Sequence, residues 1–322
     1  MESDILLLVV GLTFLWFGAE LLVKYASRLA HLSGVSPLVV GLTVVSLGTS
    51  LPELVVSLVA AIRGDMGISI GNIIGSNIAN TGLILGVGAV IVPLGIRRSW
   101  IRREVPYMLL VTGIFYFFTW TGQAITRPEG LVLLMLLFGF LGYVGRDTLQ
   151  DMEEFRELQE QAAEEPATAT LRQKLIYLSL AGVGIVVLLG GSHMAVDNGT
   201  RLAERLGVSQ SIIGLTLIAL GTSLPELATT IVSATRNAVD LAVGNIIGSN
   251  IFNLALIGGV TSVIREIPVH QEAKLLAVEM PLLCVLSLLL LPMMRIGYRI
   301  RRREGVVLLL IYATFLYLTV VL

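Results

Sequence analysis

The sequence predicts an all-α polytopic membrane protein with ten transmembrane helices, arranged as two inverted five-helix repeats. Three observations predict this fold: the composition, the spacing of apolar stretches, and a block of sequence that occurs twice. The chain has 322 residues, of which 55% are hydrophobic and 14% are charged. A soluble domain carries about a quarter charged residues, so this composition is typical of a protein that lies mostly within a bilayer.

Apolar stretches of about 20 residues, enough to cross a hydrocarbon core of roughly 30 Å, recur along the whole chain. Charged residues or Pro and Gly separate them. The start of the chain, Met1-Glu2-Ser3-Asp4, lacks the basic residues of a cleavable signal, so we expect a retained first span. The ten predicted helices cover residues 4–23, 36–62, 68–92, 104–121, 128–146, 174–196, 209–234, 241–264, 275–294 and 305–322.

The distribution of basic residues predicts the orientation. If the N-terminus lies outside, 16 of the 22 Lys and Arg residues fall on the inner side of the predicted helices. Positive charge concentrates on the cytoplasmic side, so both termini are expected to be extracytoplasmic in the plasma (inner) membrane. We therefore divide the chain into a first repeat (1–146), an acidic cytoplasmic linker that we expect to be a solvated helix (147–173), and a second repeat (174–322).

Two blocks of sequence are repeated with one constant offset. Residues 41–53 match 214–226, and residues 71–80 match 244–253, in both cases 173 positions later. This offset contains five predicted helices, so the second copy enters the membrane from the opposite side. Inverted repeats of this kind are typical of transporters that bind their substrate at the bilayer midplane. Many of the identical positions are polar or helix-breaking, which favours a functional site over duplicated packing.

Each copy places one carboxylate, Glu53 or Glu226, near the middle of a predicted span. A carboxylate in hydrocarbon is costly, and no basic residue within the spans is available to pair with it, so we expect a mobile cation as counter-charge. Pro52 cannot donate to the carbonyl of Gly48, and the second copy repeats this arrangement, which frees carbonyl oxygens for the site. Further oxygens are expected from Thr49, Ser50, Thr222, Ser223, Ser76, Asn80, Ser249 and Asn253.

Oxygen ligands without His or Cys favour hard cations, and Ca²⁺ takes six to eight oxygens. Two Glu charges balance one Ca²⁺, two Na⁺, or one proton on each Glu. The residues therefore leave open a Na⁺/Ca²⁺ antiporter, a H⁺/Ca²⁺ antiporter and a cation channel. We expect no enzyme, because the predicted spans contain neither a catalytic dyad nor a His-rich metal motif. We expect no cofactor beyond the transported ions, and the net charge of −1 gives no indication of nucleic-acid binding.

The motif Gly-Thr-Ser-Leu-Pro-Glu at 48–53 and 221–226, followed in each copy by Gly-Asn-Ile-Ile-Gly-Ser-Asn, resembles the alpha repeats of the cation/calcium exchanger superfamily. The similarity is greatest to the prokaryotic sodium/calcium exchanger branch. The resemblance implies ten helices, electrogenic exchange of Na⁺ for Ca²⁺, and sliding of the first helix pair of each half. It implies that Ca²⁺ is held by Glu53, Glu226 and the carbonyls of Thr49 and Thr222. The sodium sites it implies are Ser46, Ser50, Ser76, Ala219, Ser223 and Ser249.

One position departs from the family. Many members carry Asp at the last polar position of the second block, where this sequence has Asn80 and Asn253. The site therefore has two carboxylates rather than three, which argues against potassium co-transport. Glu20 and Glu279 are further acids within predicted spans. Glu20, which the offset matches to His193, is expected near the membrane interface, and Glu279 is interpreted as a polar contact.

Overall fold

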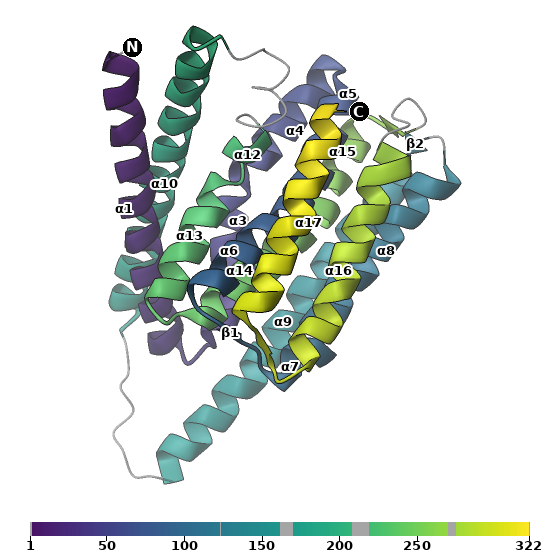
Figure 1. Cartoon of the computed structure of the whole chain (residues 1–322). Coiled ribbons are helices and arrows are strands. Elements are labelled where there is room, and N and C mark those ends of the chain that lie inside the picture. Colours follow the sequence, from purple (N-terminus) through teal and green to yellow (C-terminus); the bar gives the residue numbers. More distant parts are fainter. Residues whose placement is uncertain (1, 123, 162–169, 208–218, 270–274, 322) are drawn as a thin grey trace.

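The computed structural model describes residues 2–122, 124–161, 170–207, 219–269 and 275–321. These residues form helices joined by turns and two pairs of very short strands (Figure 1). Six of the described helices are long and apolar enough to cross a membrane, and a pair bent by 45° would make a seventh. The chain is therefore a multi-pass α-helical membrane protein.

The first half contains thirteen described elements. They are α1 (Glu2–Ser33), α2 (Pro37–Val40), η1 (Gly41–Val45), α3 (Ser46–Thr49), α4 (Leu51–Arg63), α5 (Met66–Ile78), η2 (Ala79–Ile84), α6 (Leu85–Ile91), β1 (Leu94–Gly95), α7 (Arg98–Arg102), α8 (Glu104–Thr121), β2 (Ala124–Ile125) and α9 (Arg127–Gln161). The elements η1, η2 and, in the second half, η4 lie in the repeated sequence blocks and are π-helical turns within longer helices.

The second half follows a similar order. Its described elements are α10 (Leu171–Arg205), α12 (Ala219–Gly221), α13 (Leu224–Thr235), α14 (Val239–Ile251), η4 (Phe252–Ile257), α15 (Gly258–Ile264), β3 (Ile267–Pro268), η5 (Leu275–Glu279), α16 (Met280–Arg295), β4 (Arg299–Ile300) and α17 (Arg302–Val321).

The predicted spans differ from these helices mainly at their ends. α8 coincides with predicted span 104–121, whereas α1 and α9 continue well beyond theirs. In α1 the apolar stretch stops before Lys24 and Arg28, but these side chains lie over the ring of Tyr25 and the helix continues beneath them. α9 runs through the predicted repeat border at 146. The count of ten spans is not confirmed by length and composition, since α8 and α17 are not among the six.

Three predicted segments lie partly outside the described residues. The undescribed parts are residues 209–218 of the seventh predicted span, residues 162–169 of the predicted linker and residue 322 of the tenth span. The division into two repeats and a linker therefore stays a prediction.

The predicted Pro breaks are present in both halves. Ser50 (φ −84°, ψ 8°) separates α3 from α4, and Ser223 (φ −91°, ψ 5°) precedes α13. Pro52 and Pro225 each lie in the first turn of the new helix, where the missing N–H removes no intrahelical hydrogen bond. The chain thus starts a new helix at each break instead of bending one continuous helix.

The elements of the two halves correspond through the sequence offset. α5, η2 and α6 begin and end 173 residues before α14, η4 and α15. In Figure 1, α1 and α13 run from top to bottom, whereas α10 and α4 run from bottom to top. The N-terminus and the end of α17 lie at the top, and the end of α9 lies at the bottom. β1 pairs with β4 at the lower end, and β2 pairs with β3 at the upper end, both antiparallel.

α1 and α10 form a closely packed antiparallel pair at the edge of the bundle (Figure 1). A Cβ added to Gly18 would lie 2.3 Å from the amide nitrogen of Leu188, and one added to Gly191 would lie 2.3 Å from that of Leu15. Only glycine permits backbones to approach this closely, as in other membrane helix pairs. The pair shares a small apolar cluster with α13, whereas the main core is formed by α5, α6, α8, α14, α16 and their neighbours.

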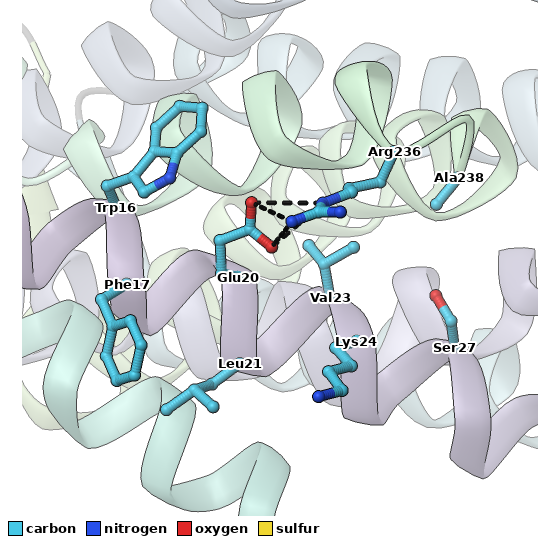
Figure 2. A pocket seen from close by; sticks show the side chains of 9 residues that line it. All are labelled: Trp16, Phe17, Glu20, Leu21, Val23, Lys24, Ser27, Arg236 and Ala238. Carbon is cyan, nitrogen blue, oxygen red and sulfur yellow. Dashed lines mark hydrogen bonds and ion pairs between the residues drawn. The ribbon is translucent and has the colours of Figure 1, made fainter.

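An ion pair connects α1 to the end of α13 (Figure 2). Nε and Nη2 of Arg236 donate to the carboxylate of Glu20 at 2.9–3.2 Å. The two side chains line a cavity of about 690 Å³ together with Trp16 and Lys24. The sequence gave no indication of this contact. The constant offset pairs Glu20 with His193, whereas Arg236 lies 216 residues further along the chain.

Exchanging the charges of this pair tests its contribution to stability. Glu20→Arg alone and Arg236→Glu alone each place like charges together, so we expect both to lower the midpoint of thermal unfolding in detergent. The double variant should recover most of the loss, with a coupling free energy of about 0.5–1 kcal/mol because the pair is partly exposed. If the double variant loses as much stability as the two single variants added together, the two residues do not stabilise the fold as a pair.

Candidate functional site

The two carboxylates predicted to bind a cation are buried. Glu53 is 1% exposed and Glu226 is 0% exposed. Each lies in the first turn of a helix that begins after a break, where the free N–H groups and the helix dipole stabilise negative charge. On the other side of each break a short helix, α3 or α12, ends, and its last carbonyls carry partial negative charge. Each break therefore combines a stabilised carboxylate with carbonyl oxygens that can face a cation.

Each carboxylate accepts a hydrogen bond from a serine of the opposite half. Ser50 Oγ donates to Glu226 Oε1 at 3.1 Å, and Ser223 Oγ donates to Glu53 Oε1 at 3.2 Å. Each of these serines lies three residues before the Glu of its own half. The crossed bonds therefore bring the two breaks and their carboxylates together. Both halves contribute to a single buried site.

The threonines of the two breaks are also bonded across the halves. Thr49 Oγ1 donates to Asn245 Oδ1 at 3.1 Å, and Thr222 Oγ1 donates to Asn72 Oδ1 at 3.4 Å. Because the hydroxyls are used in this way, each threonine side chain is held in place while its main-chain carbonyl lies at the break. This arrangement is compatible with the family resemblance, which implies that the main-chain carbonyls of both threonines bind Ca²⁺.

Asn72 and Asn245 were not among the predicted site residues. Asn72 Nδ2 also donates to the main-chain oxygen of Glu53 at 3.0 Å and to Ser57 Oγ at 2.8 Å, which fixes the turn that carries the carboxylate. The signal that could have found the two asparagines was present in the sequence. They are identical in the two copies and polar within predicted spans, the same criteria that selected Ser76 and its partner.

Several buried oxygen atoms of the predicted site have no hydrogen-bond partner among the described residues. They are Oε2 of Glu53, Oε2 of Glu226, Oγ of Ser76, and the amide oxygens of Asn80 and Asn253. The amide nitrogens of Asn80 and Asn253 have no such partner either. Buried polar atoms nearly always have a partner, so an unpartnered oxygen on each of two buried carboxylates is unusual. Hard cations such as Ca²⁺ take carboxylate, amide, hydroxyl and carbonyl oxygens as ligands. The donor set therefore fits a cation.

Asn80 and Asn253 lie in equivalent π-helical turns, η2 and η4. η2 contacts α13, which carries Glu226, and η4 contacts α4, which carries Glu53. Each asparagine segment therefore contacts the helix that carries the Glu of the opposite half. Short π-helical turns inside α-helices occur frequently at functional sites.

α10 lies against both breaks. A Cβ added to Gly48 would lie 2.4 Å from Ile185 Cδ1, and one added to Gly221 would lie 2.5 Å from Val196 Cγ2. Ser192 Oγ, also on α10, donates to the carbonyl of Gly221 at 3.0 Å. This is the carbonyl that Pro225 was predicted to free, and the serine satisfies it. Ser192 has no repeat signal, since the matching position is Ala19.

The residues implied as sodium ligands are distributed unevenly. Ser249 Oγ donates to Glu226 Oε1 at 3.5 Å, so it joins Ser50 at the same carboxylate. Ser46 is fully buried, and its hydroxyl donates to the carbonyl of Thr43 at 3.3 Å. It packs against α14, where a Cβ added to Gly248 would lie 2.5 Å from its oxygen. Ala219 begins α12.

Comparison with known proteins gives consistent matches over nearly the whole chain. The family model described as sodium/calcium exchanger protein matches residues 3–145 and 176–321. The putative antiporter CaxA of Alkalimonas amylolytica is 37% identical over 315 residues, which cover 96% of each protein. The sodium/calcium exchanger MaX1 of Methanosarcina acetivorans is 33% identical over 97% of each protein. A solved structure of the sodium-calcium exchanger NCX_Mj matches with a TM-score of 0.83 and 30% identity, covering 98% of this chain and 97% of that one.

Proposed function

The chain belongs to the sodium/calcium exchanger protein family, and we propose that it is a secondary antiporter that exchanges Na⁺ for Ca²⁺ by alternating access. The observation that supports this most directly is the crossed pair of hydrogen bonds, Ser50 to Glu226 and Ser223 to Glu53. It draws two buried carboxylates from different halves into one site. Such a site can open to one side of the membrane or the other when the halves move.

The charge of the site provides a reason for exchange. Two ionised carboxylates in a low-dielectric interior are costly unless cations balance them. One Ca²⁺ or two Na⁺ restore neutrality using overlapping oxygens, so binding of one ion displaces the other. An empty site would carry both charges through the membrane, which disfavours its reorientation. Coupling follows because only the loaded forms cross.

The proposed architecture is ten helices in two inverted repeats. It is supported by the common offset of α5–α6 and α14–α15 and by the opposite directions of α1 and α10. The strand pairs β1–β4 and β2–β3 also support it, since each pairs a strand of the first half with one of the second. The N-terminus and the end of α17 lie at one end of the bundle, and most Lys and Arg residues are predicted at the other end. Since basic residues concentrate on the cytoplasmic side, we place both termini outside the cytoplasm. The NCX_Mj structures come from protein soaked with Na⁺, Ca²⁺ or Sr²⁺, in keeping with Ca²⁺ and Na⁺ as the ions bound here.

A H⁺/Ca²⁺ antiporter is the second candidate, because each Glu can also be neutralised by one proton while its serine hydrogen bond is kept. Ca²⁺ uptake into proteoliposomes distinguishes the two candidates. We expect an outward Na⁺ gradient to drive uptake, and pH or K⁺ gradients alone to fail. Uptake that is independent of Na⁺ and follows the pH gradient would support the second candidate, and flux far above carrier rates would indicate a channel.

Asn253→Asp is expected to change the ion coupling. A third carboxylate leaves one negative charge that a Ca²⁺ ion does not balance, so a proton or a further Na⁺ must accompany it. Ca²⁺ transport by this variant should depend more steeply on pH or on Na⁺ concentration than transport by the natural chain. Asn198→Asp is the control, because Asn198 is a buried asparagine on α10 whose amide nitrogen bonds to Met194 O outside the site. Unchanged coupling in Asn253→Asp would mean that this side chain does not contact the ion.

A further inference from the structure

A cavity of about 340 Å³ adjoins the candidate site on one side. Its wall includes Asn72, Ser76 and Thr222, which belong to the site or are bonded to it, and also Glu279 and Tyr312. The cavity therefore connects the residues around the two carboxylates with a third acidic side chain that the site itself does not use.

Glu279 lies at the last position of η5, directly before α16 and within a predicted membrane span. Its side chain is partly buried. An acidic residue at this depth normally faces a cavity or a partner and is often functional. The repeat gives it no counterpart, because the matching position in the first half is Pro106. The carboxylate is therefore a feature of one end of the molecule only.

Part of the cavity wall comes from the end of the bundle that carries the termini. Its wall contains residues 312, 315, 316 and 319 of α17, which belong to the C-terminal half of that helix. In Figure 1 this half lies at the top, at the same end of the bundle as the N-terminus. Glu279 thus shares this cavity with Ser76 and Thr222 of the candidate site.

We propose that Glu279 binds hydrated hard cations, Ca²⁺ and Na⁺, in this cavity and delivers them to Glu53 and Glu226 from the side of the membrane where the termini lie. The proposal rests on the proposed exchange function. A carboxylate in a narrow, low-dielectric cavity concentrates cations and replaces part of the hydration that they lose. Because Glu279 has no counterpart in the first half, its effect is confined to one side of the membrane.

Transport measured separately from each side tests this proposal. In right-side-out and inverted vesicles, Glu279→Gln should raise the KM for Ca²⁺ at least about threefold on the side of the termini, by loss of the local attraction. The KM on the opposite side and the maximal rate should stay unchanged. Glu279→Asp should retain the natural KM because it keeps the charge. Glu266→Gln is the matched control, since Glu266 is an exposed acid at the same end, directly before β3, and outside this cavity.

The sidedness also separates ion binding from a structural role, since Glu279 has an interaction of its own within the protein. A residue needed only for packing would lower the maximal rate or alter both sides equally. An unchanged KM on the side of the termini, or an equal rise on both sides, would overturn the proposal.

A binding measurement makes the proposal independent of transport. Tb³⁺ is a hard cation whose emission is sensitised by a nearby tyrosine, and Tyr312 lines the cavity. In the full-length chain carrying Glu53→Gln and Glu226→Gln, we expect sensitised emission that falls when Tyr312→Phe or Glu279→Gln is added. Emission that is insensitive to Glu279 would refute the cavity site. If that dependence is present but the natural chain fails to exchange Na⁺ for Ca²⁺, the proposed function fails and the cation site stands.

Discussion

Glu53→Gln and Glu226→Gln are each expected to abolish Ca²⁺ transport. Removing one partner of a buried charge interaction costs about 2–5 kcal/mol, which weakens Ca²⁺ binding by about 30-fold to 4,000-fold. The substitution changes charge more than structure, because glutamine keeps an Oε1 atom that can accept the hydrogen bond from Ser223 or Ser50. Ca²⁺ uptake into proteoliposomes and calorimetric Ca²⁺ binding to the purified protein measure the two effects.

Glu104→Gln is the matched control for these variants. Glu104 is 5% exposed and begins α8, so it is a buried acid outside the two breaks. We expect this variant to retain Ca²⁺ binding. Retained exchange in Glu53→Gln or Glu226→Gln would refute the site, and an equal loss in Glu104→Gln would show that neutralising any buried acid is sufficient.

Gly191→Ala is expected to have the largest effect among substitutions that leave charge unchanged. The added methyl group would lie 2.3 Å from the amide nitrogen of Leu15 and 2.7 Å from the carbonyl of Gly11, both main-chain atoms that cannot rotate away. Forcing α1 and α10 apart should cost about 1–3 kcal/mol. It should also move Ile185 and Val196 away from the breaks that they contact, so transport should fall together with the thermal midpoint.

The neighbouring glycine provides a control for this prediction. A Cβ added to Gly190 meets no atom within 4 Å, and the residue is exposed on the same helix. Gly190→Ala should therefore leave stability unchanged or raise it slightly, because alanine is the better helix former. If both variants behave alike in thermal unfolding and transport, the close approach of α1 and α10 has no energetic importance.

The breaks and the correspondence of elements were predictable because they depend on local chemistry. A proline within an apolar stretch must interrupt the hydrogen-bond ladder, and the structure has a break before Pro52 and before Pro225. The constant offset likewise predicted which elements would correspond. The ends of α1, α9 and α10 were not predictable, since they depend on whether charged residues at a helix end remain helical beyond the apolar stretch.

Contacts between distant segments were the least predictable part of the site. The sequence selected Glu53, Glu226 and their serines, but it could not show that each serine bonds to the carboxylate of the other half. Ser192 and Arg236 find partners on other helices, and neither had a repeat signal. Asn72 was missed for a different reason, since its signal was present and was not used.

The pairing of α1 with α10 has a consequence for biosynthesis. The glycine face of α1 packs against α10, which is synthesised only after α2–α9. Until then α1 has only lipid or other early helices as neighbours. The amino-terminal half therefore cannot reach its final packing alone, and assembly of this protein is completed late, when the translated second half returns to the first helix.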